Sequence, residues 1–137
     1  MVESLRLKLK EQKGFTLIEL LAVIVILGII AAIAIPAIGN VINKSDAKAE
    51  AQSGLQIINA AKLYVANNNV TAPDNLDDTE LAEYLDSVTD GNGDPATGFS
   101  VDVGKATTGS KYTYTLKGFG TIAKTSATEA ALIKAAK

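Results

Sequence analysis

The sequence lacks both cysteine and histidine, and it has no tryptophan. Without cysteine the chain has no disulfide staples and no thiolate nucleophile, and without histidine it loses the usual zinc ligand sets and the commonest general base. These absences predict a protein that is not an enzyme. The four tyrosines are interpreted as packing residues and not as an electron-carrying or base-stacking array; they are Tyr64, Tyr84, Tyr112 and Tyr114.

An excess of basic residues is also missing. The net charge is -2 and the pI is near 5.1, which argues against a protein that coats nucleic acid through a basic surface. The charge is unevenly placed, because residues 1–14 hold four basic and two acidic side chains, a sum of +2. The remainder therefore carries nine basic and 13 acidic side chains, a sum of -4.

One long apolar run dominates the chain. Leu20 to Ile35 is 16 consecutive residues drawn only from Leu, Ala, Val, Ile and Gly. With Leu17 and Ile18 before it and residues 37–38 after it, the run reaches membrane-spanning length at about 1.5 Å per residue. A cationic start, an apolar run and an acidic remainder predict a membrane-inserted chain with a cytoplasmic N-terminus.

A secretory signal peptide is the alternative interpretation of this run. It ends in Ala32-Ile33-Ala34, which matches the A-x-A pattern of a signal peptidase site, although the run is longer than the usual apolar region of such a peptide. In that case a secreted binding domain would be released after Ala34.

A single carboxylate, Glu19, stands beside the apolar run. A charged group at mid-bilayer costs about 2.5 to 3.5 kcal/mol on insertion scales, so such a residue usually has a partner. The alternative is that Glu19 lies at headgroup depth and is solvated.

Residues 13–19, KGFTLIE, together with the apolar tract that contains Pro36, resemble the class III signal of type IV pilins and the related pseudopilins. The resemblance covers about residues 1 to 70. It implies that a prepilin peptidase cuts between Gly14 and Phe15 and that the new Phe15 amine is methylated. It also implies that Glu19 pairs with the Phe15 amine of a neighbouring subunit during assembly.

Gly28 and Pro36 lie inside the expected hydrophobic helix. In a helix Gly costs about 1 kcal/mol relative to Ala, and Pro costs about 3 kcal/mol because it removes a backbone hydrogen bond. A kink at Pro36 is one interpretation. The resemblance implies the other, that residues 28–36 bend or locally unwind in the filament and make it extensible.

The rest of the chain predicts an α+β fold. The helix is expected to continue as an amphipathic helix to about Ala66 and to stop at residues 67–69, which are all Asn. Residues 71–75 are expected to form a loop, and residues 77–86 a short helix that Asp77 and Glu80 start as a capping box. Alternation predicts strands at 99–103 and 112–116 and a third at 121–123, and residues 128–137 have helical residue types. This small antiparallel sheet is expected to pack on the upper half of the long helix, which is the ladle fold of pilins.

Two groups of polar residues each allow two interpretations. The first is expected to be a solvated helix face, with pairing between subunits as the alternative; it comprises Lys44, Asp46, Lys48 and Glu50. The second could hold calcium through alternating oxygens, but Gly, Asn, Asp and Pro are also the residues of a tight turn; it comprises Asp90, Asn92 and Asp94. Apart from this possible calcium no cofactor is expected.

The resemblance implies a cytoplasmic leader at 1–14, a transmembrane and polymerisation helix at 15–38, and a globular pilin domain at 39–137. The resemblance implies the major subunit of a type IV pilus that serves adhesion, motility or DNA uptake, with a pseudopilin of a competence or type II secretion system as the alternative. The implied partners are further copies of the chain, a prepilin peptidase, the pilus assembly machinery and the cytoplasmic membrane, and the assembled filament would lie at the cell surface. Many Gram-negative pilins have a cysteine pair that closes a C-terminal loop. This chain has no cysteine, which favours a Gram-positive or other disulfide-free lineage.

Overall fold

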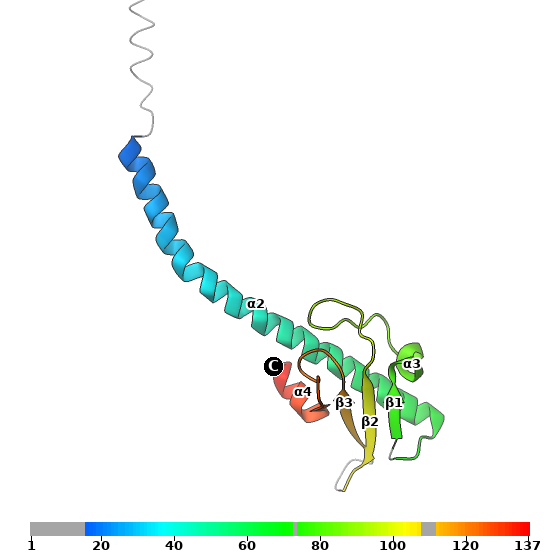
Figure 1. Cartoon of the computed structure of the whole chain (residues 1–137). Coiled ribbons are helices and arrows are strands. Elements are labelled where there is room, and N and C mark those ends of the chain that lie inside the picture. Colours follow the sequence, from blue (N-terminus) through cyan, green and yellow to red (C-terminus); the bar gives the residue numbers. More distant parts are fainter. Residues whose placement is uncertain (1–15, 73, 108–111) are drawn as a thin grey trace, which may run out of the picture. The chain divides into compact units, whose positions relative to one another are not determined.

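The computed structural model describes residues 16–72, 74–107 and 112–137 (Figure 1). Its first element is the 52-residue helix α2, Leu17–Asn68. Asn69 follows with a positive φ of 49°, the left-handed conformation that ends helices and that Asn tolerates. The predicted stop at the Asn run is therefore confirmed, two residues beyond Ala66. The predicted cleavage site at Gly14 and Phe15 lies outside the described residues.

Four antiparallel strands form one sheet in the order β1-β2-β3-β4. The strands are β1 Asp74–Asp77, β2 Ser100–Lys105, β3 Tyr112–Lys117 and β4 Ala127–Thr128. Strands β2 and β3 pair along their whole length, from Ser100 opposite Lys117 to Lys105 opposite Tyr112. The α+β class and the two central strands are thus confirmed, whereas the expected number of about three strands is one too few.

The prediction of a loop at residues 71–75 is wrong at its end, because Asp74 and Asn75 belong to the edge strand β1. Asp and Asn have low strand propensity, so the strand conformation of this segment depends on its contacts with other parts of the chain. Leu76 is buried opposite Val101, and the Asn75 side-chain amide donates to the Asp102 carboxylate on β2. These contacts with a distant strand override the local preference.

The third predicted strand, residues 121–123, is also wrong. This segment is a turn, held by two backbone hydrogen bonds between Phe119 and Ala123 of 3.2 and 3.0 Å. Gly118 and Gly120 both have positive φ, 69° and 50°, which turns the chain away from an extended course. The last strand is β4, four residues further along.

Two short helical segments flank the sheet. After β1 the chain forms α3, Asp78–Leu81, and the 3-10 helix η1, Ala82–Tyr84. The predicted capping box is confirmed, since the Asp77 carboxylate accepts from the Glu80 backbone N–H and the Glu80 carboxylate from the Asp77 N–H, but the helix ends before Asp86. After β4 comes α4, Glu129–Ala135, whose N-cap is Thr128.

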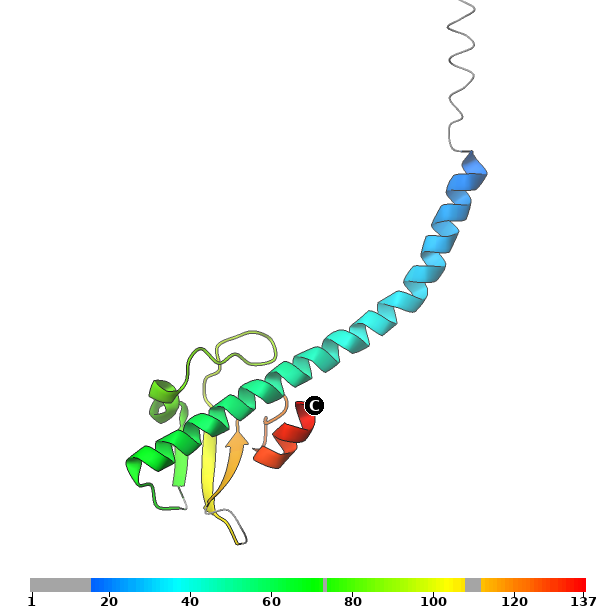
Figure 2. The ribbon, with the colours of Figure 1, turned by 180° about the vertical axis from the view of Figure 1, so that it is seen from behind.

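The hydrophobic core lies in the unit of residues 42–137, between the second half of α2 and one face of the sheet (Figure 2). Ile57, Ile58 and Ala61 of α2 are fully buried there, and each large apolar side chain contributes about 1.5–3 kcal/mol by leaving water. A Cβ added to Gly54 would lie 3.2 Å from the side chains of Leu116 and Leu132. This glycine therefore lets the sheet and α4 approach the helix closely.

The capping box predicts how acid affects this unit. A hydrogen bond from the Thr79 hydroxyl, and next the one from the Glu80 backbone N–H, lower the pKa of Asp77 below its ordinary value of 3.8. A lowered pKa contributes stability that is present above the unfolded pKa and is lost as the pH falls through the folded pKa. Asp77→Asn keeps a capping side chain that does not titrate.

We therefore expect the Tm of the detergent-solubilised chain to fall less in Asp77→Asn than in the wild type between about pH 5 and about pH 2.5. Circular dichroism during heating measures this, and Asp86→Asn is the control because Asp86 is exposed and lies beyond η1. An identical acid response of Asp77→Asn and the wild type would contradict the role given to this carboxylate.

Candidate functional site

The first turn of α2 holds the Glu19 carboxylate at the start of the helix. The Thr16 backbone N–H donates to Glu19 Oε2 at 3.1 Å, and the Glu19 backbone N–H donates to Thr16 Oγ1 at 3.3 Å. This reciprocal pair is a second capping box, with Thr16 at the N-cap position. This capping box was not predicted from the sequence, although Thr-x-x-Glu ahead of an apolar run is its signal. The positive end of the helix dipole further favours a carboxylate at this place.

The large apolar side chains in the first half of α2, residues 17–42, are exposed. This half of the helix is coloured blue to cyan in Figure 1. An 18-residue window has a mean hydropathy of 3.0, and none of it is buried. Length and composition make α2 a candidate membrane span, and the lack of burial distinguishes it from the core helix of a soluble protein. Soluble monomers rarely expose a continuous apolar surface of this size. The exposed residues are Leu17, Ile18, Leu20, Leu21, Val23 to Leu27, Ile29, Ile30, Ile33, Ile35, Ile38, Val41 and Ile42.

Gly28 and Pro36 both lie within α2, and the helix is continuous through each. A Cβ added at Gly28 would have nothing within 4 Å. The structure thus gives Gly28 no packing role within the part of the chain that it describes. The prediction that residues 28–36 give the filament its extensibility stays a prediction.

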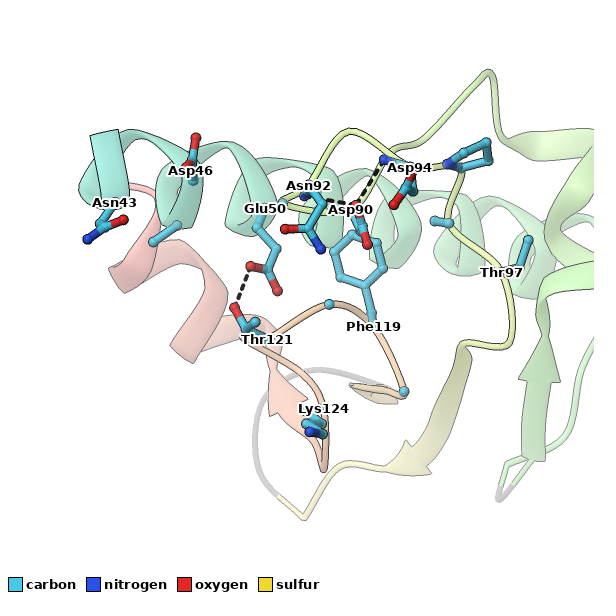
Figure 3. Close-up of a pocket in the computed structure, with 16 residues that line it drawn as sticks. Asn43, Asp46, Glu50, Asp90, Asn92, Asp94, Thr97, Phe119, Thr121 and Lys124 are labelled. Carbon is cyan, nitrogen blue, oxygen red and sulfur yellow. Dashed lines mark hydrogen bonds between the residues drawn. The ribbon is translucent and has the colours of Figure 1, made fainter. Parts of the chain in front are cut away.

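Glu50 corrects the interpretation of the second half of α2. It was expected on a solvated polar face, but it is only 3% exposed. Its carboxylate accepts a hydrogen bond from the Thr121 hydroxyl at 2.7 Å (Figure 3). It also accepts one from the Ile122 backbone N–H at 2.6 Å. The other three members of that group are exposed as expected; they are Lys44, Asp46 and Lys48.

The loops around Glu50 fit its carboxylate closely. A Cβ at Gly120 would lie 2.1 Å from Glu50 Oε1, and a Cβ at Gly91 would lie 2.8 Å from Oε2. Glycine at both places therefore lets two loops that are distant in sequence close over one side chain, beside an open cleft of about 650 Å³. Helical spacing carried the signal for this burial, because Glu50 lies four residues before Gly54 and seven before Ile57 on the core face of α2.

The possible calcium loop is built as a turn. Asp90 Oδ1 accepts the backbone N–H groups of Asn92 and Asp94 at 2.9 and 3.0 Å, and Gly93 takes a positive φ of 86°. In the described residues there is no group of three or more acidic, His or Cys side chains placed to hold a metal ion. The geometry supports the alternative of an ordinary turn closed by an aspartate side chain.

Comparison with known proteins gives one family model and several similar proteins. The profile of the prokaryotic N-terminal methylation motif matches residues 9–35. A type IV major fimbrial protein FimA of Dichelobacter nodosus is 46% identical over 57 residues, which are 42% of this chain and 33% of that protein. FimA of strain VCS1703A is 38% identical over 96 residues, which are 69% of this chain and 48% of that protein.

The chain therefore spans a third to about half of the length of the curated relatives it matches. No solved structure matches the chain.

The buried carboxylate gives a stability prediction. Glu50→Ala leaves the Ile122 N–H without its acceptor, so we expect a loss of about 1.5–3 kcal/mol in the free energy of unfolding. Denaturant unfolding of the solubilised chain measures it, and Asp46→Ala is the control because Asp46 is exposed one turn earlier on α2. Equal stability of Glu50→Ala and Asp46→Ala would show that the carboxylate does not anchor the loop.

Proposed function

We infer that the chain belongs to the type IV pilin family, and we propose that it is the major structural subunit of a type IV pilus and not an enzyme. The observation that carries the proposal is the exposed apolar first half of α2, which bears the methylation motif at its start. The similar proteins are named as fimbrial proteins, which favours a pilus over the pseudopilus alternative.

The proposed life of the subunit follows from the segments of the chain. The leader 1–14 stays in the cytoplasm, residues 15–38 cross the cytoplasmic membrane, and residues 39–137 form the globular domain outside it. A prepilin peptidase removes the leader between Gly14 and Phe15, and the Phe15 amine is methylated. The assembly machinery then moves the subunit from the membrane into a filament at the cell surface. Because this cut precedes the apolar segment, the polymerisation helix is kept.

Glu19 has a physical role in this assembly. Cleavage creates a positive amine at Phe15, and an unpaired charge is costly inside a bundle of apolar helices. The capping box places the Glu19 carboxylate at the start of α2, four residues from position 15. Pairing of this carboxylate with the amine of a neighbouring copy offsets the cost of burying both charges and fixes the axial register of the subunits.

Glu19→Gln tests the charge separately from the helix cap, because Gln also forms a capping box. We expect normal processing of the precursor but at least about tenfold fewer surface filaments, since removing one partner of a buried ion pair costs about 3–5 kcal/mol. Filaments sheared from producing cells are measured by immunoblot.

Thr16→Ala is the control, because it removes the capping hydroxyl and keeps the carboxylate. It should have the smaller effect on filament number. A normal filament yield from Glu19→Gln would rule out the pairing.

The cut itself is tested at the residue before it. Gly14→Val should block processing because the bulkier residue occupies the place where the chain is cleaved, and the product should migrate at the size of the full precursor. Mass spectrometry of the wild-type product should give a chain that starts at methylated Phe15. A mature chain that starts at Ile35 would instead support the signal peptidase alternative.

A further inference from the structure

Charge is separated along the globular part of the chain. Residues 63–104 carry nine acidic side chains and neither Lys nor Arg. Residues 105–137 carry six lysines and one acidic residue, Glu129. The first segment is therefore strongly acidic and the second strongly basic. Each attracts a surface of the opposite charge.

The fold carries this separation to opposite edges of the sheet. Strand β1 is one edge and is followed directly by α3 and η1, while β4 is the other edge and is followed directly by α4. Figures 1 and 2 show α3 and α4 on opposite sides of the central strands. We name the two surfaces by their exposed charges: the acidic flank is Asp74, Asp77, Glu80, Glu83 and Asp86, and the basic flank is Lys124, Lys134 and Lys137.

Ion pairs within the molecule do not cancel these flanks. Glu129, the one acidic residue of segment 105–137, pairs with Lys62 of α2. Asp102 of the central strand β2 pairs with Lys117 of β3. None of these four residues belongs to the acidic or the basic flank, so these two ion pairs do not neutralise the flanks.

The basic flank also has an apolar side chain at its surface. Ile133 of α4 is 43% exposed and lies beside Lys134 in sequence. An apolar centre with a charged rim is typical of a protein interface. Because one flank is positive and the other negative, each repels a copy of itself and attracts the other.

We propose that the acidic flank of one copy docks on the basic flank of the next copy in the filament, an inference that rests on the proposed pilin function. The contact is heterologous, since two different surfaces meet, and such contacts repeat into open helical assemblies. Apolar contacts between the helices do not fix a register, which inside the core rests on the proposed Glu19 pairing. The flanks add a directional contact outside the core, where like charges brought face to face oppose a wrong register.

Charge exchange tests the contact in producing cells. Glu83→Lys and Lys134→Glu should each lower the yield of filaments by roughly fivefold, because each places like charges in the contact. Combining both substitutions in one chain restores opposite charges and should restore most of the yield. Lys105→Glu is the matched control for Lys134→Glu: it makes the same change in net charge at the end of β2, outside the basic flank, and should leave the yield unchanged.

The outcomes separate this inference from the proposed function. Absence of filaments from the wild-type chain overturns the proposed function. Wild-type filaments whose yield is unchanged by both single substitutions, or reduced without recovery in the combined variant, overturn the flank contact alone.

The lack of cysteine allows a direct test of proximity. Filaments of the double variant Glu83→Cys with Lys134→Cys should form a ladder of disulfide-linked multimers on oxidation, because each copy would join two neighbours. Filaments of either single variant should give none of this ladder. Monomers alone from assembled double-variant filaments would overturn the contact.

Discussion

The apolar surface of the first half of α2 is the constraint on which the rest of the structure depends. Residues 17–42 expose almost only hydrocarbon, and no other described part of the unit to which residues 1–41 belong covers it. Water is a poor solvent for such a surface, so it requires lipid or other apolar helices. In the proposed function the subunit exchanges lipid for the helices of further copies. The globular part has a buried core of its own, which does not depend on that exchange.

Two carboxylates of the same helix show how position decides the role of a charge. Glu19 lies at the helix start, where a capping box holds it near the chain end that cleavage would expose. Glu50 lies on the core face, where it accepts two hydrogen bonds from the loop at residues 121–122. The first is left available for contact with another copy. The second satisfies polar groups within its own fold, which is the usual condition for burying a charge.

Features set by near neighbours in sequence were the ones that could be predicted. The long helix, its stop at the Asn run and the capping box at Asp77 depend on residues within a few positions of each other, and all three were found. Strand β1 was missed because its partner strand is distant in sequence. The turn at residues 121–123 was missed because alternation alone does not show the positive φ of Gly118 and Gly120 or the contact of Ile122 with the distant Glu50. Helical spacing indicates that Glu50 lies on the core face of α2, but no local pattern shows that the loop at Gly120, 70 residues away, closes over its carboxylate. The separation of charge between the two edges of the sheet could not be predicted either, because it depends on which strands lie at the edges.

Electron cryo-microscopy of filaments from cells that produce this chain tests the central claim most directly. The account predicts a map in which the apolar helices of neighbouring copies pack together along the filament axis. In that map the Glu19 carboxylate should lie about 3 Å from the Phe15 amine of an adjacent copy. Filaments in which residues 17–41 face solvent, or in which residues 1–14 remain attached, would contradict it.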